Sequence, residues 1–124
     1  MSDEKCKVLV VDDHRDGADS AVLLLLMWGH DAIAAYTAEQ ALQLAETFDP
    51  DVVLMDIGLP GKNGFDVAKQ IRERCPAARL VALTGFTREH IVRRSRELGF
   101  SDHLTKPADP AVLKDVVETQ CERS

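Results

Sequence analysis

The chain has 124 residues, close to the commonest size of a single folded domain and enough to bury one hydrophobic core. Its 15 basic and 21 acidic side chains give a formal net charge of −6, which disfavours nonspecific binding to nucleic acid or to anionic membranes. The longest apolar run, residues 21–28, is far shorter than the roughly 20 residues that span a bilayer, so we expect no membrane insertion. We expect the partners to be other proteins.

Apolar runs alternate with helix-length segments five times along the chain. We predict strands at 6–11, 31–36, 51–55, 79–83 and 101–104, and the lack of polar alternation in the first of them indicates burial on both faces. We predict helices at 16–28, 37–48, 65–73 and about 87–98, and a last helix that begins at Asp109 and Pro110. Thr37 and Gln40 form a capping box, and Gly29 ends the first helix. Leu23 to Met27 and Trp28 are expected in the core.

This alternation predicts the fold class. Strands separated by helices imply a parallel sheet with right-handed crossovers and helices on both faces. Five such units without a sixth strand favour a flavodoxin-like, doubly wound α/β fold with strand order 2-1-3-4-5. We expect a single domain over 1–124, with a core of about 6–121 and no effector domain.

Five polar residues stand at the ends of predicted strands: Asp12, Asp13, Asp56, Thr84 and Lys106. In a doubly wound sheet, ligands bind beyond the carboxyl ends of the strands, so these residues should share one crevice. Two carboxylates about 4 Å apart repel by roughly 4 kcal/mol at an effective dielectric near 20, so three of them favour a bound cation. Hard oxygen ligands with open positions suit Mg²⁺.

Simpler interpretations of individual residues compete with this site. Asp12 and Asp13 could be N-capping residues of the following helix. His14, His30 and His90 show no metal-ligand spacing.

The cysteines predict the compartment. Cys6, Cys75 and Cys121 are odd in number, widely spaced and without a metal-finger pattern. The N-terminus lacks a basic start followed by an apolar segment, so we expect no signal peptide. We therefore expect reduced thiols and a cytoplasmic protein.

Four motifs carry a resemblance to a known family. They are Val-Val-Asp12-Asp13, Leu-Met-Asp56-Ile-Gly-Leu-Pro60 with Gly64 beyond it, Leu-Thr84-Gly85, and Leu-Thr-Lys106-Pro107. In this order, the chain resembles a response-regulator receiver domain of bacterial two-component signalling over essentially its whole length. The Thr84-Gly-Phe loop and the 99–103 turn look most like receivers attached to hybrid sensor kinases.

The resemblance implies a role for each residue of the site. Asp56 would accept a phosphoryl group from a sensor histidine kinase or a histidine phosphotransfer protein. Asp13, Asp56 and the backbone carbonyl of Gly58 would bind Mg²⁺, with Asp12 acting largely through water. Thr84 and Lys106 would contact phosphoryl oxygens, and the bond from Lys106 to the next residue, a proline, would be cis.

The resemblance also implies a switch. Phosphorylation would draw Thr84 inward, and the strand 5 residue that would fill the vacated space, usually aromatic, is His103 here. Gly58 and Phe86 cannot position water, which predicts slow self-dephosphorylation. In the family, the signal leaves through an output face formed by the helix near 87–98, the fifth strand and the last helix. This face carries four arginines, at Arg88, Arg93, Arg94 and Arg96, which could bind an acidic partner or form a solvated basic face.

Three other functions compete with a phosphoacceptor that only promotes its own phosphotransfer. A haloacid-dehalogenase-type phosphatase needs its nucleophile and a second acid two residues apart, which Asp12-Asp13-His14 lacks. A flavin-binding carrier would want hydroxyls and glycines after strand 1, where acids repel phosphate. A phosphorylation-independent interaction module remains an alternative, although no phosphorylation residue is missing. A phosphorylated chain would bind a downstream protein, relay its phosphate or serve within a hybrid kinase.

Overall fold

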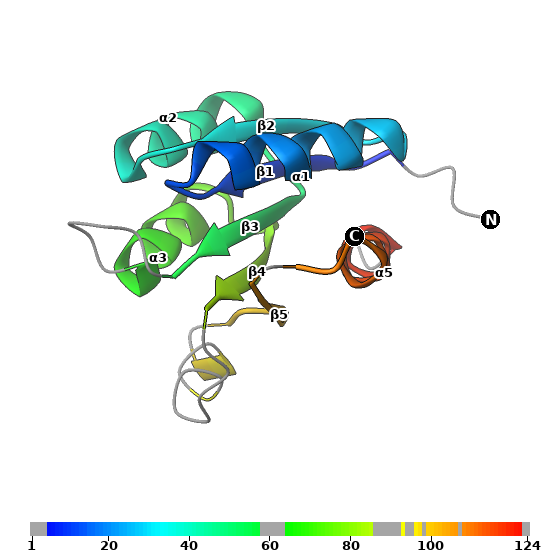
Figure 1. Ribbon diagram of the computed structural model, residues 1–124. Helices are drawn as coiled ribbons and strands as arrows, with labels where there is room; N and C mark the ends of the chain where they lie inside the picture. The colour runs from blue at the N-terminus through cyan, green and yellow to red at the C-terminus, as the bar shows by residue number, and fades with distance from the viewer. Residues whose placement is uncertain are drawn as a thin grey trace.

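One parallel sheet of five strands organises the molecule (Figure 1). The computed structural model describes residues 5–57, 64–85, 93, 96–97, 99–106 and 108–122. The strands are β1 (Lys7–Val11), β2 (Asp31–Ala35), β3 (Val52–Asp56), β4 (Arg79–Thr84) and β5 (Asp102–Thr105). Their order is β2-β1-β3-β4-β5, and every neighbouring pair is parallel. The predicted fold class and strand order are confirmed.

Helices cover both faces of the sheet, which explains why the central strands are apolar throughout. The described helices are α1 (Arg15–Met27), α2 (Ala38–Phe48), α3 (Gly64–Arg74) and α5 (Pro110–Glu122). One core cluster joins α2 and α3 to side chains such as Leu9 and Val53, and the other joins α1 and α5 to Val10 and Leu54. The helix predicted near 87–98 lies largely outside the described residues.

The helix ends follow the predicted capping chemistry. Thr37 accepts a hydrogen bond from the Gln40 amide at 3.1 Å, and the Gln40 side chain accepts one from the Tyr36 amide at 2.8 Å. Gly29, at φ +93°, closes α1 with its amide on the Leu26 carbonyl. The next amide bonds to the carbonyl of residue 25, which completes a Schellman motif. Local sequence therefore fixes where α1 ends and α2 begins.

The expectation that Leu23 to Met27 is core is wrong for most of the run. Leu25 is fully buried, but Leu23, Leu26 and Met27 are 61%, 47% and 78% exposed. A continuous apolar run covers every side of a helix, and only one side can face the sheet. Among the described residues, no helix combines the length and the apolar character needed to cross a bilayer.

The expectation of three reduced thiols is also wrong. Cys6, just before β1, forms a disulfide with Cys121 in the last turn of α5, with Cα atoms 5.9 Å apart. Both residues are buried in the α1/α5 cluster. Cys75 is free and buried, and its thiol donates to the Ala45 carbonyl at 2.9 Å. Because α5 runs antiparallel to the strands, its end returns to the start of β1.

Candidate phosphoacceptor and metal site

The carboxyl ends of the strands bring the predicted site residues together. Asp56 and Thr84 are the last residues of β3 and β4, whereas the prediction placed each of them one residue beyond the end of its strand. Backbone hydrogen bonds to neighbouring strands fix these ends: the Asp12 amide donates to Ala35 at 3.0 Å, and the Lys106 amide donates to Thr84 at 2.8 Å. The rim formed by Asp12, Asp13, Asp56, Thr84 and Lys106, hereafter the carboxyl rim, is therefore a rigid platform.

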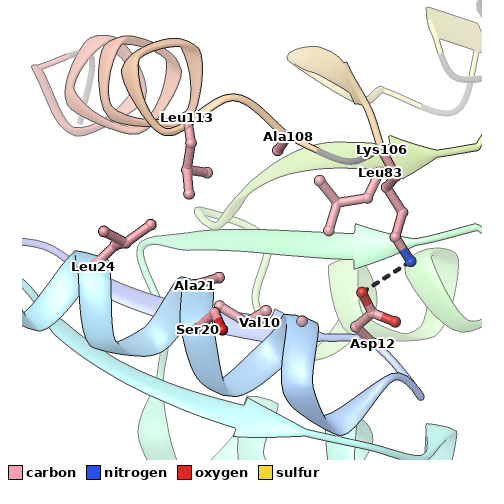
Figure 2. Close-up of a pocket in the computed structure, with 10 residues that line it drawn as sticks. Val10, Asp12, Ser20, Ala21, Leu24, Leu83, Lys106, Ala108 and Leu113 are labelled. Atoms are coloured by element: carbon pink, nitrogen blue, oxygen red, sulfur yellow. Dashed lines mark ion pairs between the residues drawn. The ribbon is translucent and has the colours of Figure 1, made fainter.

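Lys106 bridges two buried carboxylates on this rim. Its Nζ lies 3.0 Å from Asp12 Oδ2 and 3.2 Å from Asp56 Oδ2. Asp12 and Asp56 are 3% and 5% exposed, whereas the Lys106 side chain is 25% exposed. Figure 2 shows the ammonium reaching from the end of β5 to Asp12. A buried carboxylate is costly unless it is paired, so Lys106 stabilises both acids.

The electrostatics keep this bridge charged. Burial alone would raise the pKa of Asp12, but hydrogen bonds from the His14 amide and Lys106, with the lysine charge, lower it below its ordinary value. Burial alone would lower the pKa of Lys106, but its hydrogen bond to Asp12 and the nearby Asp56 and Asp12 charges raise it. Both groups are therefore ionised at neutral pH.

Asp12 does not cap α1, contrary to the simpler interpretation. The N-cap residue is His14, whose side chain makes no capping hydrogen bond. Asp12 Oδ1 instead accepts from the His14 backbone amide at 3.0 Å and lies 3.2 Å from the ring nitrogen Nδ1. With Lys106 on its other oxygen, the Asp12 carboxylate is fully engaged. The turn after β1 thus serves the carboxyl rim.

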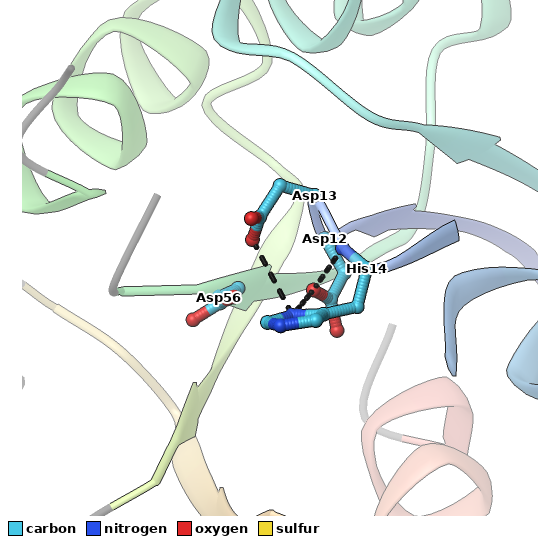
Figure 3. A group of neighbouring side chains, drawn as sticks. All are labelled: Asp12, Asp13, His14 and Asp56. Atoms are coloured by element: carbon cyan, nitrogen blue, oxygen red, sulfur yellow. Dashed lines mark hydrogen bonds and ion pairs between the residues drawn. The ribbon is translucent and has the colours of Figure 1, made fainter. Parts of the chain in front are cut away.

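Four side chains could hold a metal ion. One ligand atom each from Asp12, Asp13, His14 and Asp56 lies within 4.8 Å of the other three (Figure 3). Asp13 Oδ1 is buried and accepts no hydrogen bond among the described residues, although His14 Nδ1 is 3.5 Å away. A bound cation would satisfy such a buried oxygen. The oxygen-rich donor set fits Mg²⁺, as predicted.

His14 lies beside the three carboxylates, although sequence reasoning gave it no role there. Its spacing matches no helical pair of ligands, because it directly follows Asp13 in the turn between β1 and α1. The available signal was adjacency: three consecutive ligand types stand at the end of a strand.

The other predicted residues are placed as follows. Thr84 is buried on the rim, and His103 is half-buried in β5. Arg93 and Arg96 are exposed. Four further predicted residues lie outside the described ranges: Gly58, Phe86, Arg88 and Arg94. The bond from Lys106 to the next residue is also outside them.

The carboxyl rim has a cavity on one side and tight packing on another. A cavity of about 280 Å³ lies between α1 and α5, with mostly aliphatic walls that include Leu24 and Leu113, and Asp12 and Lys106 form its polar end (Figure 2). The start of α3 leaves no such room, because a Cβ added at Gly64 would fall 2.6 Å from the Ile57 Cα. Glycine at position 64 lets α3 begin directly against the turn after Asp56.

Comparison with known proteins places this site in a family. Residues 8–118 match the response regulator receiver domain. The chain is 34% identical over 123 residues to the alkaline phosphatase synthesis transcriptional regulatory protein PhoP of Bacillus subtilis (strain 168). That alignment covers 95% of this chain and 49% of PhoP, so the chain spans about half the length of that relative.

Solved structures agree. A LuxR-family two-component response regulator from Aurantimonas sp. SI85-9A1 superimposes with a TM-score of 0.87 at 30% identity, covering 96% of this chain and 86% of that one. A CheY-like receiver domain protein from Methanospirillum hungatei JF-1, at 24% identity, has a TM-score of 0.89 over 96% and 95% of the two chains and shows the fold alone. The family match runs from β1 into α5. The chain belongs to the response regulator receiver domains of two-component signalling.

Proposed function

We propose that Asp56 accepts a phosphoryl group, with Mg²⁺, from the phosphohistidine of a sensor histidine kinase or a histidine phosphotransfer protein. The observation that carries this proposal is the Lys106 ammonium, 3.2 Å from Asp56 Oδ2 and 3.0 Å from Asp12 Oδ2. A fixed positive charge beside a buried carboxylate can neutralise phosphoryl oxygens as charge builds on them. Family membership supports the same assignment.

The transfer needs little covalent chemistry from the protein. An Asp56 oxygen attacks phosphorus, the P–N bond to the donor imidazole breaks, and the leaving imidazole nitrogen takes up a proton. The product is an acyl phosphate, and attack of water on phosphorus restores the carboxylate and releases inorganic phosphate. We propose that Lys106 then contacts a phosphoryl oxygen and that the Thr84 hydroxyl donates to another.

Bound Mg²⁺ supplies positive charge and Lewis acidity to the transferring group. We propose Asp13 and Asp56 as its direct ligands, with the Gly58 carbonyl as a third. Asp12 would act through water, which agrees with the engagement of both its oxygens by His14 and Lys106. Asp13 Oδ1, which is buried and accepts no hydrogen bond from the described residues, supports the assignment of Asp13 as a direct ligand.

We propose that the signal leaves through the surface around β5. Inward movement of Thr84 would open space next to β5, and His103 is the half-buried residue on that strand that would follow it. The phosphorylated surface would bind a downstream protein, or Asp56 would pass its phosphate to another histidine. This proposal includes no nucleic acid partner and no enzymatic action on a separate substrate.

The proposed location is the cytoplasm, where ATP charges the histidine kinases. The argument from reduced thiols no longer supports it, because Cys6 and Cys121 are paired. Alkylation of freshly lysed cells, followed by mass spectrometry, would show whether the pair exists in that reducing compartment.

Phosphorylation by acetyl phosphate tests the proposal. With Mg²⁺, we expect intact-mass spectrometry to show one added phosphoryl group, which decays over minutes or longer. EDTA and the Asp56→Asn variant should abolish the addition. Asp115→Asn, an exposed carboxylate on α5, is the matched control and should leave it unchanged.

Two outcomes would contradict the assignment. A phosphoryl group retained in Asp56→Asn would place the modification on another residue. A folded wild-type protein that takes up none would favour a phosphorylation-independent interaction module. A lifetime of only seconds would contradict the slow hydrolysis expected from Gly58 and Phe86.

A further inference from the structure

We propose that His14 supplies an imidazole nitrogen to the metal held by Asp12, Asp13 and Asp56, so that this site prefers first-row transition ions to Mg²⁺. The inference deepens the proposed function and rests on it, because it adds one ligand to the same metal site. It begins from the position of the His14 ring at the open side of the three carboxylates (Figure 3).

The distances fit coordination with little movement. Two ligands on opposite sides of an ion, each about 2.1 Å from it, are about 4.2 Å apart. Single ligand atoms from the three aspartates and His14 already lie within 4.8 Å of one another. Side-chain movements of a few tenths of an ångström would therefore bring the Asp13, Asp56 and His14 atoms to bonding distance without movement of the strands, with Asp12 reaching the ion through water.

The backbone of His14 is anchored, and its ring is largely exposed to solvent. Its amide donates to Asp12 Oδ1 at 3.0 Å, which anchors the turn. The side chain is 72% exposed, so packing does not hold the ring in another orientation. The ring nitrogen Nδ1 lies 3.2 Å from Asp12 Oδ1 and 3.5 Å from Asp13 Oδ1. An anchored backbone with an exposed ring suits a ligand that joins the ion from the solvent side.

A second observation points to the same space. Asp13 Oδ1 is buried without a hydrogen-bond donor among the described residues, and it lies 3.5 Å from His14 Nδ1, slightly farther than Asp12 Oδ1 at 3.2 Å. An ion between these two groups would satisfy the carboxylate oxygen and take the ring nitrogen as a further ligand.

Ligand chemistry then predicts the selectivity. Mg²⁺ keeps oxygen ligands and waters, and gains little from an imidazole. Imidazole nitrogen suits Co²⁺, Ni²⁺ and Zn²⁺. If His14 only forms a hydrogen bond to Asp12, its removal should lower the affinity for all divalent ions similarly or not at all. If it is a ligand, its removal should weaken the transition ions selectively.

Metal binding by calorimetry separates these cases. Untagged wild-type protein and His14→Asn are titrated with Co²⁺ and with Mg²⁺. We expect His14→Asn to lose about tenfold or more in Co²⁺ affinity, and about twofold or less in Mg²⁺ affinity. Asp13→Asn, which removes an oxygen ligand, should weaken both ions. His30 and His103 stay in every variant, so a selective loss is assigned to position 14.

A spectroscopic measurement identifies the nitrogen. With Mn²⁺ bound, pulsed electron paramagnetic resonance should detect ¹⁴N coupling from an imidazole in the wild type and none in His14→Asn. Equal Co²⁺ affinity in the two proteins, or identical nitrogen coupling, would overturn the inference.

Failure of the inference and of the proposed function can be told apart. Phosphorylation of His14→Asn by acetyl phosphate with Mg²⁺ should persist, because Asp56 and Lys106 are intact. If it persists while Co²⁺ affinity is unchanged, only the role of His14 is wrong. If wild-type protein binds neither ion and takes up no phosphoryl group, the metal site and the phosphoacceptor role both fail.

Discussion

The two ends of the β-sheet are held together by different kinds of interaction. At the carboxyl rim, Lys106 bridges Asp12 and Asp56 through ion pairs of 3.0 and 3.2 Å. At the opposite end, hereafter the amino rim (Cys6, His30 and Cys121), a disulfide joins β1 to α5, and the Cys6 amide donates to His30 Nδ1 at 3.3 Å. Charges can exchange partners when a ligand binds, whereas a buried covalent bond cannot. The fold thus holds one end of the sheet by exchangeable ion pairs and the other by a covalent bond.

Loss of the disulfide tests the amino rim and should have the largest effect on stability. The bond closes a loop with a sequence separation of 115 residues. We expect Cys6→Ser with Cys121→Ser to lower the free energy of unfolding by about 3–5 kcal/mol, because the unfolded chain gains entropy. Urea denaturation without reductant measures the difference.

The reductant provides the control. It should destabilise the wild type by a similar amount and leave the double variant unchanged, since the remaining Cys75 is free. Phosphorylation of the double variant by acetyl phosphate should persist under conditions where it is folded. Equal stability of the two proteins without reductant would show that the link does not hold the amino rim.

Loss of the lysine tests the carboxyl rim. Lys106→Met leaves two buried carboxylates without their shared cation, so in metal-free buffer we expect unfolding free energy to fall by about 2 kcal/mol. Lys5→Met is the matched control: its ion pair with Asp31 spans 3.9 Å between side chains 66% and 54% exposed, so we expect a change under about 0.5 kcal/mol. Addition of Mg²⁺ should restore part of the loss in Lys106→Met.

The destabilisation by Lys106→Met should depend on pH in a direction that the two pKa shifts predict. The pKa of Asp12 is lowered in the folded protein, so its contribution is present above the unfolded value near 4 and is lost as pH falls through the folded pKa. The pKa of Lys106 is raised, so its contribution is present below the unfolded value near 10.4 and is lost as pH rises through the folded pKa.

The destabilisation by Lys106→Met should therefore be largest from about pH 6 to 9 and should shrink on both sides. Urea denaturation across this range measures it. A constant difference down to pH 3 would mean that the ion pair does not stabilise the carboxyl rim.

A pair of glycines tests the packing around the carboxyl rim. A Cβ at Gly64 would be 2.6 Å from Ile57 Cα, so Gly64→Ala should lower unfolding free energy by about 1–3 kcal/mol. A Cβ at Gly17 would meet only atoms at 3.8 Å or beyond, so Gly17→Ala should raise it by up to about 1 kcal/mol, as alanine favours the helix. Thermal unfolding compares the two, and a stabilised Gly64→Ala would contradict the close approach.

The sequence predicted most of the fold because local and global signals agreed. The buried strands were readable as apolar runs, and the caps at Thr37 and Asp109 marked where helices begin. The strand order followed from the number of units, and the topology rule then brought Asp12 and Asp56 together. The clustering of these acids was therefore predictable without knowledge of any distance.

The errors came from contacts that local patterns do not encode. Pairing of Cys6 with Cys121 depends on where α5 ends relative to β1, and spacing along the chain carries no such information. The position of His14 beside the acids likewise depends on the turn after β1, which its spacing along the chain does not describe. The apolar run of α1 has no period, so it could not show that Leu23 and Met27 face outward.

The disulfide has a practical consequence for handling the protein. The Cα atoms of Cys6 and Cys121 are only 5.9 Å apart. A group attached next to either cysteine would therefore lie at the amino rim, at the opposite end of the sheet from the acids of the carboxyl rim. A fluorophore, affinity handle or sensor surface coupled there would leave the phosphoacceptor open to a kinase. The same proximity makes the two positions a natural junction for a circular permutant.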